Sequence, residues 1–195
     1  KHFTSVNYSL WHLFRDEQRD VISRVLNSAI TDLERSLRQL NEINLPVIHV
    51  LKKTGVPLPG VFSSIMEFIL NDDLKKMLGS EYPGHEELTR IISQMREWNF
   101  TPDTTGISYI FTERINGFME RYISEPGKRE ILEKIVDLMD TVKPLSLKFE
   151  RWSIQNMYFV IGKSLYHEMK QKAYSGDTDA AEWISLFDRL GTHLK

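Results

Sequence analysis

The sequence contains no cysteine among its 195 residues. This absence excludes a disulfide scaffold, a thiol nucleophile and a cysteine-based zinc site. No apolar stretch approaches the roughly 20 residues that span a bilayer, and the first residues do not form a signal peptide. The charge is nearly balanced, with 25 basic and 27 acidic residues, whereas nucleic-acid modules usually have a pI above about 9. We therefore expect a cytoplasmic protein that binds neither a membrane nor a nucleic acid.

Apolar residues recur at spacings of three and four along nearly the whole chain, beginning with one long stripe between residues 16 and 43. No window of strand length alternates apolar and polar residues. The sequence therefore predicts an all-α fold, a bundle-like single domain over residues 1–195 with about seven to nine helices and no sheet. Because the chain starts at Lys1 without an initiator Met, we expect it to be an excised piece of a longer protein.

Prolines, glycines and capping residues predict where individual helices begin and end. We expect the first long helix to stop at Asn44-Leu45, and a second to open with Pro46 and to end at Gly55. Thr101-Pro102-Asp103 has the pattern of an N-cap Thr followed by Pro at the first helical position. Asp179 with Glu182 resembles a capping box for the last helix.

The segment from Leu147 to Tyr174 is apolar almost all round in its middle, between Met157 and Ile161. A helix of this kind is usually buried among other helices. Trp152 and Phe159 are seven residues apart and therefore share one face of this helix. We expect both side chains to belong to the core.

Two short motifs resemble functional sites but lack an essential residue. Gly162-Lys163-Ser164 matches the end of a phosphate-binding loop, but Met157 occupies the position of the glycine that this loop requires. His167-Glu168 matches the start of a zinc-binding helix, but Gln171 stands where the second histidine belongs. We therefore assign no catalytic, cofactor-binding or metal-binding residue and expect no cofactor.

Two polar clusters are unusual because each adjoins aromatic residues. The first follows an aromatic run at Tyr8, Trp11 and Phe14, and consists of Arg15, Asp16, Glu17 and Arg19. The second opens the apolar segment and consists of Trp152, Gln155 and Asn156. The clusters form either a buried polar network that ties helices together or an inter-domain or cleft-side surface that docks on another domain.

The same segments resemble a known family. Tyr8-Ser9-Leu10 and residues 13–19 are similar to a stretch near the start of the C-terminal region in a subgroup of glycoside hydrolase family 57 proteins. The similarity continues over nearly the whole chain, at residues 55–59, residues 67–74, Trp152 with Gln155-Asn156 and Tyr158, and residues 187–191. In these bacterial proteins, which are described as α-amylase- or α-mannosidase-like, the region is a domain of unknown function.

The resemblance implies a division of labour within a longer polypeptide. In that family the nucleophile and the general acid lie in an N-terminal barrel-like domain, and no residue of this chain matches their motifs. The resemblance thus implies that residues 1–195 are the C-terminal part of a longer protein, a non-catalytic helical accessory domain that packs on the N-terminal catalytic barrel and shapes its cleft for an α-glucan or another polysaccharide. The alternative is a free-standing helical interaction module or a small enzyme of unrelated chemistry.

Overall fold

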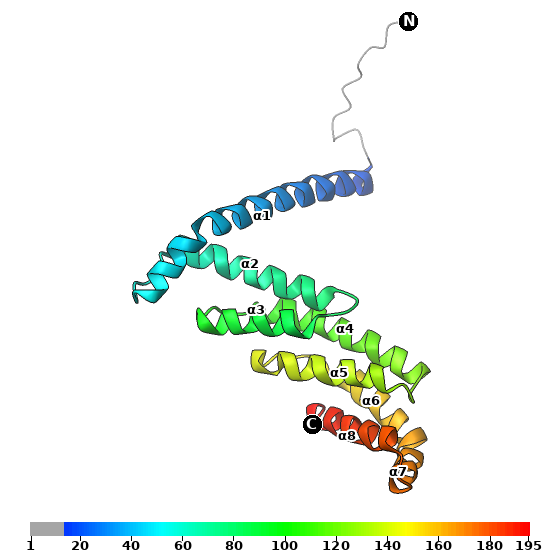
Figure 1. Cartoon of the computed structure of the whole chain (residues 1–195). Helices are drawn as coiled ribbons and strands as arrows, with labels where there is room; N and C mark the ends of the chain where they lie inside the picture. Colours follow the sequence, from blue (N-terminus) through cyan, green and yellow to red (C-terminus); the bar gives the residue numbers. More distant parts are fainter. Residues whose placement is uncertain (1–13) are drawn as a thin grey trace, which may run out of the picture. The chain divides into compact units, whose positions relative to one another are not determined.

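The computed structural model describes residues 14–195. Trp11 and the segment Tyr8-Ser9-Leu10, which carries part of the family resemblance, lie outside the described residues. Helices make up 82% of residues 14–195, and this part of the chain contains no strand, which confirms the predicted all-α fold (Figure 1). Seven α-helices result when the run 152–174 is counted as one. Backbone contacts divide the chain into two compact units that meet between Ile69 and Leu70, and each unit is described by itself.

Unit 1 contains α1 (Arg15–Lys53) and the first half of α2 (Gly60–Gly79). The predicted break before Pro46 is wrong, because α1 runs through this residue without interruption. The fixed φ of proline, about −65°, is itself helical, although an interior proline lacks one backbone hydrogen bond and its ring crowds the carbonyl of the residue four positions earlier. The predicted end at Gly55 is confirmed. Gly55 has a φ of 70°, and the N–H of Val56 donates to the carbonyl of Leu51 at 3.0 Å, which closes a Schellman motif.

Unit 2 begins in the second half of α2 and contains the remaining helices. These are α3 (His85–Glu97), α4 (Thr104–Ser124), α5 (Arg129–Val142), the 3₁₀ turn η2 (Lys143–Leu145), α6 (Trp152–Ile161), the π-helical turn η3 (Gly162–Tyr166), α7 (His167–Tyr174) and α8 (Thr178–His193). Helix α5 contacts α3, α4 and α8, and α4 also contacts α6. The largest side chains buried in this core include Trp183, Tyr122 and Phe111.

Helix α4 begins two residues later than the sequence predicts. Its N-cap is Asp103, whose carboxylate accepts the N–H of Gly106 at 3.1 Å, so the prediction of Thr101 as N-cap is wrong. The Asp103 carboxylate also pairs with the ammonium group of Lys75, and the N–H of Asp103 donates to Asn71 Oδ1 at 2.6 Å. An ionised carboxylate at the positive end of the helix, held by a second charge, is a stronger cap than a hydroxyl.

Helix α8 is capped by Asp177, whose carboxylate accepts the N–H of Ala180 at 3.0 Å. The predicted capping box of Asp179 and Glu182 is therefore wrong. Both carboxylates instead bind the guanidinium of Arg129, at 2.7 Å and 2.5 Å respectively. Because Arg129 is the first residue of α5, these ion pairs tie the start of α8 to the start of α5.

A wide turn at η3 sets the directions of two tyrosines. In a regular α-helix each residue turns by about 100°, so residues eight apart differ by about 80°. A π-helical turn holds one residue more and removes about 100° of rotation. Tyr158 and Tyr166 therefore face the same side, and their ring centroids lie 4.2 Å and 5.7 Å from that of Phe187. Gly162 allows this approach, because a Cβ there would lie 3.3 Å from the Phe187 ring.

Candidate functional site

One face of α6 carries uncovered aromatic and aliphatic side chains. Trp152 is 72% exposed and Phe159 is 59% exposed, so the prediction that they belong to the core is wrong. They do share a face, as their spacing requires. Helix α6 packs against α4 and buries Ile154 and Ile161 on its other side. An apolar composition all round buries a helix only where neighbours cover every side, and in unit 2 they cover one side of α6.

Polar groups flank this face. Asn156 lies between Trp152 and Phe159 in the same i, i+4, i+7 series and is exposed. The ammonium group of Lys163 lies 4.6 Å from the centroid of the Phe159 ring, a cation–π contact. Val160 is 56% exposed beside them. We call Trp152, Asn156, Phe159, Val160 and Lys163 the α6 face.

The other two polar groups at the start of α6 have structural roles. Gln155 Nε2 donates to the carbonyl of Leu194 at 2.5 Å and so ties α6 to the end of α8. Glu150 accepts the backbone N–H groups of Trp152 at 2.6 Å and Ser153 at 3.4 Å, which caps the first turn. The second predicted cluster is therefore split: Trp152 and Asn156 belong to a surface, and Gln155 holds two helices together.

The first predicted cluster lies in the first turns of α1, in unit 1. Its side chains Arg15, Asp16, Glu17 and Arg19 are exposed. Glu17 Oε2 accepts the backbone N–H of Phe14 at 3.2 Å, an ordinary helix-start contact. Among the described residues of unit 1 these side chains form no buried network. The two clusters belong to different units, and the structure does not bring them into one site.

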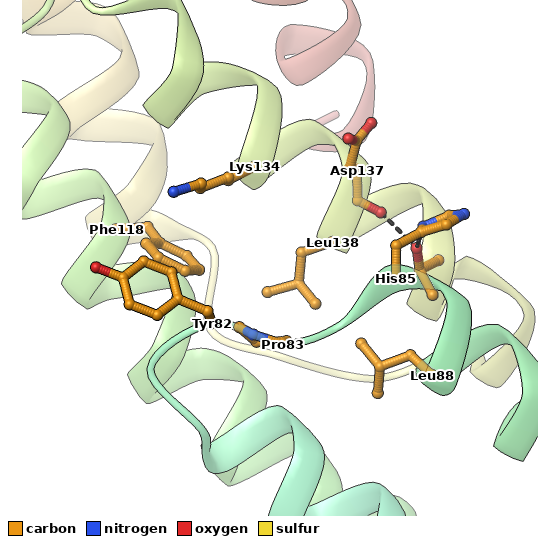
Figure 2. Close-up of a pocket in the computed structure, with 9 residues that line it drawn as sticks. Tyr82, Pro83, His85, Leu88, Phe118, Lys134, Asp137 and Leu138 are labelled. Atoms are coloured by element: carbon orange, nitrogen blue, oxygen red, sulfur yellow. Dashed lines mark hydrogen bonds between the residues drawn. The ribbon is translucent and has the colours of Figure 1, made fainter.

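A pocket of about 210 Å³ lies in unit 2 between the start of α3 and helices α4 and α5, and Figure 2 shows its lining. Pro83, Leu88, Phe118 and Leu138 form the apolar wall. Tyr82 stands at the rim, with the ammonium group of Lys134 4.8 Å from its ring centroid. The pocket is smaller than the roughly 300–1,000 Å³ typical of drug-sized ligands.

Polar groups at the pocket are bonded to one another. Thr141 Oγ1 donates to the backbone carbonyl of Asp137 at 2.6 Å, and the His85 ring nitrogen Nδ1 lies 2.7 Å from the same hydroxyl (Figure 2). With its proton already donated to a carbonyl, the Thr141 hydroxyl accepts from His85. His85 therefore cannot act as the base that would activate this hydroxyl as a nucleophile.

A wider groove of about 630 Å³ runs along α4 and the segment before α6. Its lining is rich in hydroxyls and charged groups: Thr104, Thr105, Ser108, Tyr109, Thr112, Glu113, Ser146, Lys148, Phe149 and Glu150. The last of these caps α6, so the polar groove ends within two residues of Trp152. Sequence reasoning missed this groove. Thr104, Ser108 and Thr112 recur every four residues and share one helix face, which is the signal that could have found it.

Among residues 14–195, no group of three or more histidine or acidic side chains is placed to hold a metal ion. In the same part of the chain, every helix is too short or too polar to cross a membrane. No family model, curated protein or solved structure matches the chain. The α6 face and the groove beside it are therefore interpreted from their own chemistry.

Proposed function

We propose that the chain is a non-catalytic helical accessory domain of a glycoside hydrolase similar to family 57, and that the α6 face packs on the catalytic barrel of the same polypeptide. The observation that carries the proposal is the exposure of Trp152, Phe159 and Val160 side by side on one helix. Contiguous exposed apolar patches mark interaction sites. A tryptophan at such a site typically contributes more binding energy than its neighbours.

The groove next to the α6 face supports a role at the rim of a carbohydrate cleft. Its hydroxyls and carboxylates are the groups that hydrogen-bond sugar hydroxyls. Glu113 and Glu150 both line it, but Glu150 already accepts two backbone N–H groups. A carboxylate so engaged suits a structural role better than that of a general acid. We therefore assign cleft shaping to this surface and leave the chemistry to the barrel.

Activity assays test whether catalysis belongs to the barrel and not to this chain. The isolated chain and the full-length parent are incubated with α-glucans and aryl glycosides. We expect turnover by the parent and none by the isolated chain. Turnover by the isolated chain at a rate near that of the parent would overturn the proposal. So would a coding sequence in which an initiator Met directly precedes Lys1, with no upstream barrel in frame, because that result favours a free-standing interaction module or a small enzyme of other chemistry.

A second experiment tests the α6 face as the docking surface. The double variant Trp152→Ala/Phe159→Ala is made in the full-length parent, and Tyr174→Ala is the matched control, because this aromatic residue is 82% exposed at the end of α7. We expect the double variant to lower the melting temperature or the activity of the parent and the control to leave both unchanged. Equal behaviour of the two variants would contradict docking through α6.

A further inference from the structure

Helix α1 exposes a row of aliphatic side chains over most of its length. Nine of them are between 47% and 66% exposed: Ile22, Val25, Leu26, Ile30, Leu33, Leu40, Ile43, Val47 and Val50. Of the residues of α1, Ile48 alone is buried. The exposed side chains therefore make up most of the aliphatic surface of this helix.

This stripe follows a seven-residue repeat. Leu26, Leu33, Leu40 and Val47 are seven residues apart, and so are the residues of a second row, Ile22, Ala29, Ser36, Ile43 and Val50. The two rows alternate at spacings of three and four, as the a and d positions of a coiled coil do. We call these two rows the α1 seam. A repeat of seven sustained over four heptads keeps its apolar side facing one partner helix.

The polar residues at the α1 seam are satisfied within their own helix. Ser36 Oγ donates to the carbonyl of Asp32 at 2.9 Å, and Asn44 Nδ2, next to the seam, donates to the carbonyl of Leu40 at 2.7 Å. The Ser36 hydroxyl proton and one N–H of Asn44 therefore keep an acceptor when the seam is buried against a partner, which lowers the desolvation cost.

The charged residues of α1 also permit self-association. They pair along the helix itself, outside the seam, as in Arg24 with Asp20 at 2.5 Å and Arg38 with Glu34 at 2.9 Å. The helix as a whole has seven basic and six acidic residues, so two copies do not repel each other by net charge.

We propose that the α1 seam binds the α1 seam of a second copy of this chain. The seam covers residues 22–50, about 43 Å at 1.5 Å per residue. Within residues 14–195 the next-longest helix is α4 with 21 residues, about 31 Å, which is too short to cover it. A second α1 has the matching length and the matching repeat. Ser36 lies at the centre of the seam and meets its own copy when the two helices run parallel and in register.

The apolar area of the α1 seam approaches that of a specific interface. Burying a fully exposed Val, Leu or Ile removes about 60–120 Å² of apolar surface, from roughly 1.5–3 kcal/mol at about 25 cal/mol per Å². At 47–66% exposure, each of the nine side chains (seven in the seam, with Val25 and Ile30 beside it) contributes roughly 30–80 Å², so two chains bury about 500–1,400 Å² of apolar surface. Specific stable interfaces bury about 1,200–2,000 Å² in total, polar surface included.

The oligomeric state of the chain tests the proposal. Sedimentation equilibrium of the wild type should give a mass of about twice 22.9 kDa. Leu33→Lys/Leu40→Lys places two charges in the seam of each copy and should give a monomer. The control Thr31→Lys/Glu42→Lys places the same residue type on the exposed outer side of α1 and should keep the wild-type mass. A monomeric wild type, or a mass that the seam variant does not change, would overturn the proposal.

Cross-linking places the contact at the residue level. The chain has no cysteine, so one introduced thiol reports on one position. Oxidation of Ser36→Cys should give a disulfide-linked dimer on a non-reducing gel at protein concentrations where Thr31→Cys, on the opposite side of α1, stays monomeric. Equal cross-linking of the two variants would overturn the seam as the interface. Neither experiment uses a glycoside, so its outcome is independent of the function proposed above.

Discussion

The hydroxyl oxygen of Tyr158 lies 2.5 Å from the position that a Cβ on Gly191 would take. The Tyr158 ring has little freedom to move away, because it is stacked on the Phe187 ring at a centroid distance of 4.2 Å and an interplanar angle of 13°. Helices α6 and α8 therefore approach each other over a residue that has no side chain.

Gly191→Ala should destabilise the chain by about 1–3 kcal/mol, the usual cost of adding a methyl group to a packed contact. The control is Gly117→Ala inside α4, where no atom lies within 4 Å of the added Cβ. This control should stabilise by about 0.5–1 kcal/mol, because alanine favours a helix interior. Urea denaturation measures both, and equal midpoints for the two variants would contradict the packing described here.

Phe159→Ala should change the stability of the isolated chain by less than about 1 kcal/mol, because the ring is exposed on the α6 face. Phe111→Ala is the matched comparison, since Phe111 is fully buried. Its loss should cost about 3–5 kcal/mol. A comparable loss of stability for both variants in chemical denaturation would contradict the exposure of Phe159, because it would mean that other residues cover this side of α6.

Arg15→Ala should leave the denaturation midpoint of the isolated chain unchanged, because the side chain is exposed at the start of α1. Arg114→Ala removes a guanidinium that donates to the carbonyls of Leu78 at 3.3 Å and of Gly79, at the end of α2. This variant should lose about 1–3 kcal/mol, since the carbonyls lose their partner. A loss in Arg15→Ala as large as that in Arg114→Ala would restore the buried-network interpretation of the first cluster.

The free energy of unfolding should fall in acid, and part of this fall should come from the protonation of Asp103. The hydrogen bond from Lys75, together with that from the Gly106 N–H, lowers the pKa of Asp103 below its ordinary value of 3.8. The folded pKa thus lies below the unfolded one, so this stabilisation is complete above about 3.8 and is lost as the pH falls through the folded pKa.

Asp103→Asn keeps an oxygen at the N-cap but has no charge to lose. We expect the wild type to be more stable than this variant at pH 7 and the difference to shrink toward pH 2.5. Urea midpoints across this range measure the effect. In a Lys75→Met background, which lacks the stronger of the two partners, the stability difference that Asp103→Asn causes at pH 7 should be smaller. A stability difference that did not change with pH would show that the charge of Asp103 is not its cause.

The helical pattern was predictable because periodicity reports which face of a segment meets apolar neighbours. Helix ends were harder to predict, because several neighbouring residues are each suitable as the cap of one helix. Thr101 and Asp103 are both acceptable N-caps, and the choice depends on Lys75 and Asn71, which approach from α2. Pro46 is compatible with both a first turn and an interior position, and the surrounding helix decides between them.

The environment of the candidate site was not predictable from its residues. Trp152 and Phe159 were both expected in the core, and the structure exposes both on the α6 face. Composition counts the apolar residues of a helix but does not say how many neighbours are available to cover them. The groove along α4 has a signal of its own, the fourfold spacing of its hydroxyls, which acquires meaning only when the segment before α6 is folded against it.

The π-helical turn at η3 makes this segment tolerant of the loss of one residue. Deleting one residue between Ile161 and Tyr166 would leave Tyr166 seven residues after Tyr158, and seven residues of regular helix turn by about 700°, which is only about 20° short of two full turns. Tyr166 would therefore stay on the Phe187 side, and α7 would keep its present inner side toward α8. Related chains should accordingly have either this length with the π-helical turn or one residue fewer with regular winding, and a two-residue deletion should be tolerated less well than a one-residue deletion.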